Sequence, residues 1–373
     1  MGCPSAASAA SACAGGGASL SATLDRLYRK ARERRIPLSG SLELTWRCNL
    51  RCVHCFQDSQ RDRFEEMSTD EWKRLIDEMA RAGCLRLTLT GGEPLVRADF
   101  REIYEHAHAR GFLITLFTNG ALLREEHLEL LAERPPRAIE VTLYGASAAR
   151  YEEVSGCGAA FEPVMSATRA LAKRGLPLTL KTVVTRQLAG EFASIRGVAE
   201  ELGVGFRWDS TVVPRLDGDK APLAWRLGPQ QSLLLERAAL GSASERCPQG
   251  AARGEELLTC AATRTAFNVG PDGSLTGCVL LRQPAFSARE FGFFEAWERL
   301  GEVSLLRRSA VAGTCGSCDL WAYCRCCPAV SNLEQGSPEA PVEYHCRLAA
   351  MRQGSSRGRS AHECRRQSRA RVP

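Results

Sequence analysis

The chain has 373 residues, of which 44% are hydrophobic and 25% charged, and a formal net charge of +6. This length and composition predict a globular protein of more than one domain, since ~150 residues per domain is usual. No apolar run approaches the ~18 residues of a membrane-spanning helix, so we expect no membrane partner. Residues 352–373 hold seven arginines and one glutamate, which accounts for the whole excess charge. The rest is nearly neutral and gives no electrostatic basis for binding nucleic acid.

Strand-like and helix-like segments alternate through the first half of the chain. Strands are predicted at 41–46, 84–90, 112–120, 138–145, 176–185 and 204–210. Helices are predicted at 68–83, 99–111, 124–133, 161–175 and 192–203, the first opening on a Ser68/Glu71 capping box. This order predicts parallel pairing through right-handed crossovers. Because six units are too few for a closed eightfold barrel, we expect an α/β fold with a partial (βα)6 barrel and functional loops at the carboxyl ends of its strands.

Composition divides the chain into five predicted segments. These are a disordered and lead-in segment at 1–38 with a short basic helix, the barrel core at 39–211, a linker with a helix at 212–258, a small cysteine-rich α+β domain at 259–350, and a basic disordered tail at 351–373. The apolar content of the cysteine-rich segment is low for an independent core, so we expect metal to hold it together.

Seventeen cysteines are a strong deviation for a chain of this length. The amino terminus lacks the basic and apolar regions of an export signal, which predicts a cytoplasmic protein. Disulfides rarely persist in that compartment, so clustered cysteines indicate metal or iron–sulfur ligands.

Three of these cysteines, Cys48, Cys52 and Cys55, follow the first predicted strand with C-x3-C-x2-C spacing. Structural zinc usually takes four protein ligands, and no fourth lies nearby. Three thiolates suit a [4Fe–4S] cluster in which one iron stays open for another ligand. The next two strands deliver the motifs GGEP, at 91–94, and TNG, at 118–120, to the same rim of the barrel.

Together these motifs resemble the radical S-adenosylmethionine (radical SAM) superfamily over residues 42 to about 210. The resemblance implies that the open iron binds S-adenosylmethionine (SAM). One-electron reduction by a flavodoxin- or ferredoxin-type partner then releases a 5′-deoxyadenosyl radical, which abstracts a substrate hydrogen.

The same resemblance implies which residues contact SAM. They are His54, Gly91, Gly92, Glu93, Asn119 and Thr142. Glu93 and its turn would hold the methionine amino group, and the glycine pair would let the chain turn tightly beside the ligand. Asn119 and Thr142 lie where the family contacts the ribose, although they could equally be ordinary residues at strand ends. The sequence assigns no catalytic acid or base.

A second set of cysteines resembles the SPASM extension of radical SAM enzymes, which implies two auxiliary [4Fe–4S] clusters. One would take Cys315, Cys318, Cys324 and Cys346; the other Cys260, Cys278 and Cys327. The family places the last of these ligands at position 328, which is Pro328 here, so Cys326 competes with Cys327. Adjacent extended residues face opposite sides, hence only one of them should reach the iron. Cys247 could complete this cluster, the site could stay open, or zinc could occupy the same thiols.

Relatives with this architecture mostly modify peptides, including ribosomally made ones, so the resemblance implies oxidative cross-linking or another maturation of a peptide substrate. Val279 follows Cys278 where sulfatase maturases carry an aspartate, which disfavours that subfamily. The segment before Cys48 is shorter than the leader-binding domain of many members, so we expect any leader peptide to need a separate leader-binding protein or another surface of the chain. The alternatives are a radical enzyme acting on a small molecule or tetrapyrrole, and a non-catalytic electron carrier.

Overall fold

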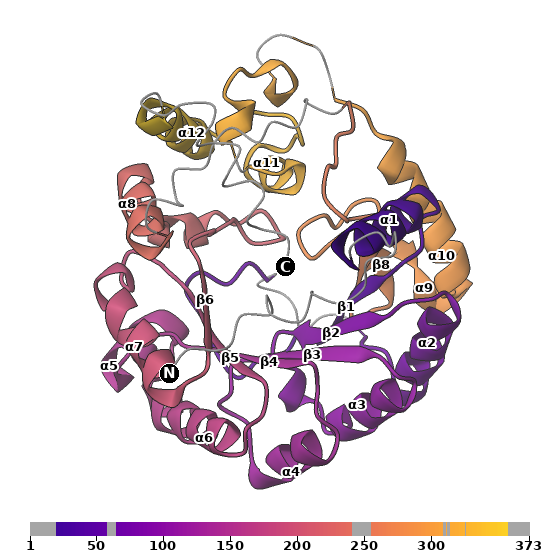
Figure 1. Ribbon diagram of the computed structural model, residues 1–373, viewed down its shortest axis with the longest axis vertical. Helices are drawn as coiled ribbons and strands as arrows, with labels where there is room; N and C mark the ends of the chain where they lie inside the picture. The colour runs from indigo at the N-terminus through magenta and orange to yellow at the C-terminus, as the bar shows by residue number, and fades with distance from the viewer. Residues whose placement is uncertain are drawn as a thin grey trace, which may run out of the picture.

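The computed structural model describes residues 20–57, 65–240, 255–308, 311, 314–324 and 326–356. Its centre is a nine-stranded sheet in the order β6-β5-β4-β3-β2-β1-β7-β8-β9. The sheet curves, and the helices that connect its parallel strands lie along its outer side (Figure 1). No helix in the described ranges is long and apolar enough to cross a membrane.

Six parallel strands and the helices between them build the first part of the sheet. The strands are β1 (Ser39–Thr45), β2 (Arg86–Gly91), β3 (Leu113–Thr118), β4 (Ala138–Thr142), β5 (Leu178–Val183) and β6 (Gly205–Asp209). The helices are α2 (Thr69–Arg81), α3 (Phe100–Ala109), α4 (Glu125–Glu133), α5 (Ala148–Ser155), α6 (Phe161–Lys173) and α7 (Phe192–Leu202). Each strand pairs in parallel with the next. The predicted partial barrel is confirmed.

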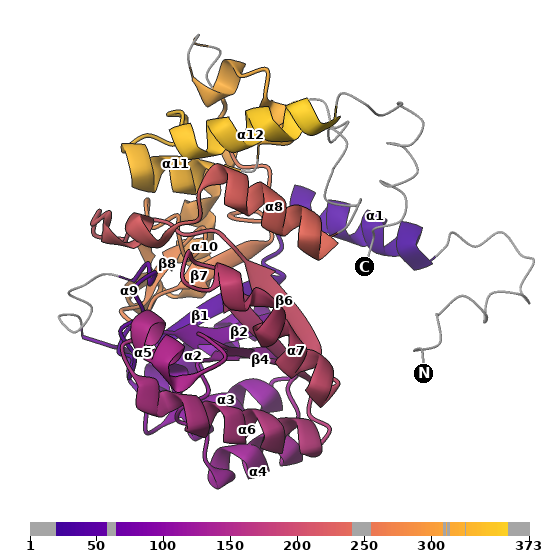
Figure 2. The same cartoon turned by 90° about the vertical axis from the view of Figure 1, so that its left-hand side faces the viewer.

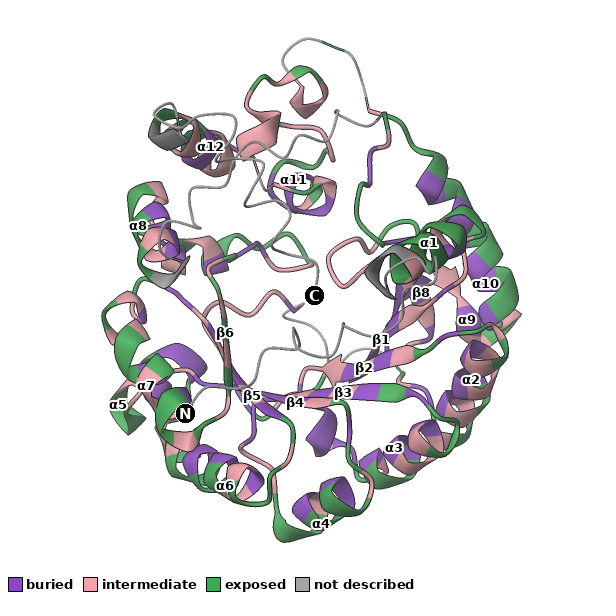
Figure 3. Cartoon of the chain, in the orientation of Figure 1, coloured by how far each residue is buried: buried purple, intermediate pink, exposed green. Residues whose placement is uncertain are grey.

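The two faces of the strands differ in polarity, as a period of two residues requires. Leu42 and Leu44 on β1 belong to the hydrophobic core, together with Trp72 and Ile76 of α2. Glu43, between the two leucines, points to the opposite, inner face, and it too is buried. Figure 3 shows the helices turning their buried sides toward the sheet and their exposed sides outward. The inner face of the barrel is therefore free to carry polar chemistry.

The cysteine-rich part of the chain continues this sheet. Strand β7 (Ala266–Val269) pairs in parallel with β1, Ser39 lying opposite Ala266, and β8 (Ser274–Thr276) and β9 (Phe286–Ser287) follow antiparallel. The domain limit at 259 stays a prediction, but the sheet runs across it. Such pairing joins residues more than 220 positions apart, so local sequence patterns give no sign of it.

The remaining helices lie outside the strand–helix units of the barrel. They are α1 (Leu20–Glu33), α8 (Pro229–Leu240), α9 (Ala288–Phe291), α10 (Phe293–Leu300), α11 (Pro328–Gln335) and α12 (Glu343–Ser356). Helix α8 packs on α12, and both lie with α11 on the side of the molecule opposite α3, α4 and α6 (Figures 1 and 2). The linker helix and the last cysteine-bearing segment thus form one layer.

Candidate functional site

The loop that follows β1 carries the first three cysteines at the carboxyl end of the sheet. Within the described residues Cys48, Cys52 and Cys55 form no disulfide, and all three are half-buried. Burial raises the pKa of the Cys52 thiol, and the nearby Cys55 and Cys48 raise it further. The three sulfurs therefore lie within electrostatic reach of one another, as ligands of one cluster would.

Helix α5, which the sequence patterns did not predict, anchors this loop. Its last turn presents the carbonyls of Val154 and Ser155, which accept hydrogen bonds from the amides of Val53 and Arg51 at 2.9 Å each. The helix has eight residues and ends at Gly156 in the left-handed conformation. So short a helix shows little periodicity in sequence, which explains why it was missed.

The GGEP turn packs directly against the end of β1. A Cβ on Gly91 would stand 2.2 Å from the carbonyl oxygen of Thr45, and one on Gly92 would stand 2.3 Å from that of Arg47. The Gly92 amide donates to Thr45 at 2.7 Å, and the Glu93 amide donates to Arg47 at 2.9 Å. The contact that requires two glycines here is thus backbone against backbone, and it fixes the turn beside the cysteine loop.

Glu93 connects this turn to the TNG motif. Its carboxylate is fully buried and accepts hydrogen bonds from the Thr118 hydroxyl at 2.8 Å and the Asn119 amide at 2.7 Å. Burial raises the pKa of Glu93 to about 7, although these donors act in the opposite direction. A cation placed next to this carboxyl would favour its ionised form.

Asn119 extends the connection to the cysteine loop. Its side-chain nitrogen donates to Asn49 Oδ1 at 2.8 Å and lies 3.8 Å from the sulfur of Cys48. The structure therefore brings Glu93, Asn119 and Cys48 into one hydrogen-bonded group.

His54 and Thr142 lie on the other side of the cysteine loop. The His54 ring lies 5.9 Å from that of Tyr144, whose hydroxyl hydrogen-bonds to Cys52. Burial lowers the pKa of His54 to about 4, and its buried Nδ1 has no partner within the described residues. Thr142 is buried at the end of β4, and its carbonyl accepts from the Tyr151 hydroxyl at 3.4 Å.

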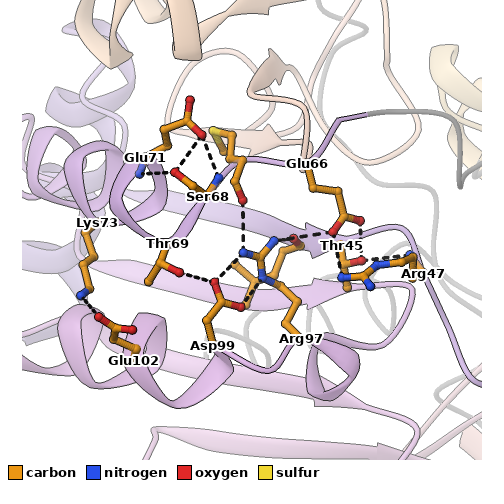
Figure 4. A network of polar contacts seen from close by, with 12 residues as sticks. Thr45, Arg47, Glu66, Ser68, Thr69, Glu71, Lys73, Arg97, Asp99 and Glu102 are labelled. Carbon is orange, nitrogen blue, oxygen red and sulfur yellow. Dashed lines mark hydrogen bonds and ion pairs between the residues drawn. The ribbon is translucent and has the colours of Figure 1, made fainter.

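A polar network, also not predicted, holds the end of β1 in place (Figure 4). Glu66 accepts from the Thr45 hydroxyl at 2.5 Å and from the Trp46 amide at 3.1 Å. Arg97, three residues beyond GGEP, is buried; it pairs with Asp99 at 2.6 Å and donates to the Leu44 carbonyl at 3.0 Å. The cysteine loop and the GGEP turn consequently leave the sheet from one rigid support.

Seven of the described cysteines after residue 259 form two further groups. Burial raises the pKa of the Cys278 thiol, and Cys327 and Cys260 raise it further. Helix α1 reaches this first group, because Arg32 donates to the carbonyl of Cys260 at 2.9 Å.

The second group contains Cys315, Cys318, Cys324 and Cys346. Burial raises the pKa of Cys315, and the thiols of Cys324, Cys346 and Cys318 raise it further. Cys247, a candidate for the first group, lies outside the described residues.

Cys326 and Cys327 have different neighbours. Cys327 lies within electrostatic reach of Cys278. The sulfur of Cys326 lies 3.4 Å from the Ser331 hydroxyl of α11 and within electrostatic reach of Cys324, Cys327 and Cys315. Within the described ranges no three His, Cys, Asp or Glu side chains converge as they would on one metal ion.

Comparison with known proteins identifies the family. Residues 42–191 match the model of the radical SAM superfamily. The chain is 30% identical over 313 residues to the AdoMet-dependent heme synthase of Methanosarcina barkeri, covering 77% of this chain and 90% of that protein. The chain belongs to the radical SAM superfamily. Its membership implies a [4Fe–4S] cluster and SAM, and the three thiols after β1 have the chemistry to ligate such a cluster.

Two further likenesses agree with radical SAM membership. The PqqA peptide cyclase of Granulibacter bethesdensis is 27% identical over 310 residues, 78% of this chain and 83% of that protein. The crystal structure of Streptococcus suis SuiB bound to the precursor peptide SuiA superposes with a TM-score of 0.67 at 16% identity, covering 85% of this chain and 78% of that one. At that identity SuiB supports the fold.

Proposed function

We propose that this radical SAM enzyme oxidatively modifies a peptide. The observation that carries the proposal is the similarity to a peptide cyclase along most of both chains. A specific observation favours a second candidate, a tetrapyrrole or other small molecule, because the haem synthase is similar over an equal length. A simple electron carrier does not need the motifs proposed to bind SAM, so the residues on the inner face of the barrel favour an enzyme.

The proposed site follows from the contacts at the rim of the barrel. Cys48, Cys52 and Cys55 would ligate the cluster, leaving one iron for SAM. Glu93 would accept a hydrogen bond from the methionine amino group. The pocket would be completed by His54, Gly91, Gly92, Asn119 and Thr142. When bound, the cluster and SAM supply a carbon radical that removes a substrate hydrogen. The chain's own part is to hold these groups in place and to keep water away from them.

We also propose two auxiliary [4Fe–4S] clusters, on Cys315, Cys318, Cys324 and Cys346 and on Cys260, Cys278 and Cys327. They would carry away the electron left after hydrogen abstraction, which makes the net reaction an oxidation. A flavodoxin- or ferredoxin-type reductant and a separate leader-binding protein would be the partners. Because the cluster thiols must stay reduced, the proposed compartment is the cytoplasm.

The peptide proposal is tested by mass spectrometry. The enzyme is co-expressed with each short peptide encoded beside its gene, and loss of two hydrogens should lower the mass of one peptide by about 2 Da. The Cys52→Ala variant serves as the control and should leave the mass unchanged. Unchanged masses for every peptide, with turnover of a tetrapyrrole by the same preparation, would establish the second candidate instead.

Alanine variants of the two neighbouring cysteines should differ in the iron that the chain binds. Cys327→Ala is expected to lower bound iron by about four per chain, because its thiol lies in the group of Cys278 and Cys260. Cys326→Ala should keep its iron, since that side chain contacts Ser331. Both variants are compared by iron and sulfide analysis after anaerobic reconstitution. Iron loss confined to Cys326→Ala would reverse the assignment.

A further inference from the structure

Glu43 occupies the point where the barrel meets the cysteine-rich segment. It lies in the middle of β1, which pairs with β2 on one side and β7 on the other. Its side chain is 1% exposed and points to the inner face. None of the roles proposed above uses it, although burying a carboxylate in this position is unfavourable unless it is fully paired.

The partners of Glu43 come from three separate segments. Gln57, two residues after Cys55, donates to Oε1 at 2.7 Å. Arg282, four residues after Cys278, donates to Oε1 at 2.8 Å and approaches Oε2 to 2.6 Å. Asn268 on β7 donates to Oε2 at 3.0 Å. A carboxylate has about four acceptor positions, and here three hydrogen bonds and one further ion-pair contact surround its two oxygens.

The contacts continue from Glu43 to the backbone of a proposed cluster ligand. Asn268 Nδ2 also donates to the Thr276 hydroxyl at 3.3 Å, and that hydroxyl donates to the carbonyl of Cys278 at 3.4 Å. Gln57, which also bonds to Glu43, is 3% exposed and follows directly on the loop of Cys48, Cys52 and Cys55. One buried carboxylate thus connects the loop of the SAM cluster with the turn of an auxiliary cluster.

We propose that Glu43 is a positioning residue that fixes these two cysteine-bearing segments relative to each other and balances the charge of Arg282 between them. The inference rests on the proposed auxiliary cluster for its electrostatic part. Stability alone does not account for the pair, because well-packed apolar side chains often replace a buried ion pair at no cost. An ion pair does supply directional contacts to several segments at once, and it sets the local charge that a cluster experiences.

The positioning role is tested by hydrogen–deuterium exchange on the full chain. Glu43→Gln replaces one accepting oxygen by an NH2 group, which faces the donors around it. The backbone amide of Val53, bonded to the Val154 carbonyl, and that of Leu281, bonded to the Cys278 carbonyl, should then both exchange faster. The matched control is Glu78→Gln, a carboxylate of α2 that accepts from the Phe293 amide of α10, away from the cysteines. Arg282→Gln, at a more exposed position, serves if Glu43→Gln fails to fold. Faster exchange in only one segment, or in neither, would overturn the proposal whether or not iron binds.

The charge balance is tested by the reduction potential of the cluster at Cys260, Cys278 and Cys327. Glu43→Gln leaves the Arg282 cation uncompensated and should raise the potential; Arg282→Gln leaves the carboxylate and should lower it. The neutral double variant should return toward the wild-type value. Shifts of equal sign in both single variants, or none, would refute the electrostatic part. A wild-type chain without any auxiliary-cluster signal would refute the proposed clusters, and the exchange result would then decide the positioning role alone.

Discussion

Cys52→Ala is expected to abolish formation of 5′-deoxyadenosine from SAM. The proposed cluster after β1 would have three protein ligands, so removing one thiol would leave two and expose the cluster to loss. The measurement is chromatographic quantification of 5′-deoxyadenosine after anaerobic reconstitution and chemical reduction. The wild type should accumulate the product, and the variant should stay at the level of the enzyme-free control.

The control for this substitution is a buried cysteine outside the three groups. Cys84, at the start of β2, is buried, and its thiol donates to the Arg86 carbonyl at 3.5 Å. Cys84→Ala should therefore keep 5′-deoxyadenosine formation, because it removes a thiol of the core and no proposed ligand. Wild-type product formation by Cys52→Ala would contradict the assignment of the first cluster.

Arg97→Met is expected to cost about 3–5 kcal/mol of unfolding free energy, as removal of one partner from a buried ion pair does. The guanidinium is 6% exposed and pairs with Asp99, and it also serves the carbonyls of Leu44 and Met67. All these groups would lose the guanidinium as a donor together. The measurement is urea unfolding followed by circular dichroism.

The comparison variant for Arg97 is Arg101→Met in α3. Arg101 is 48% exposed and pairs with Glu105 four residues on, a contact that contributes at most about 1 kcal/mol. Equal stability losses in the two variants would show that the network around Arg97 does not hold the rim of the barrel.

The sequence predicted the barrel because its elements are long and periodic. The capping box of Ser68 and Glu71 is present, with both hydrogen bonds formed at the start of α2. The motifs at Cys48, Glu93 and Asn119 could be placed on one rim in advance, since parallel strands deliver their carboxyl ends to the same edge. The carboxylate of Glu93 connects the ends of β2 and β3, and this contact follows from the parallel topology.

The supports of the site could not be predicted in the same way. Glu43 meets Arg282 across 239 positions, and Arg97 meets the carbonyl of Leu44 across 53. Charged residues on strands and loops are common, and no local pattern marks the few that become buried partners. The parallel pairing of β7 with β1 was missed for the same reason: a four-residue strand carries too little periodicity to reveal a distant neighbour.

We propose that the chain binds one SAM cluster and two auxiliary clusters, and iron and acid-labile sulfide per chain after anaerobic reconstitution decide between this and other metal contents. Three [4Fe–4S] clusters contain about twelve irons and as many sulfides, and this is the expected result. About four irons, with zinc in the remaining thiols, would rule out the auxiliary clusters.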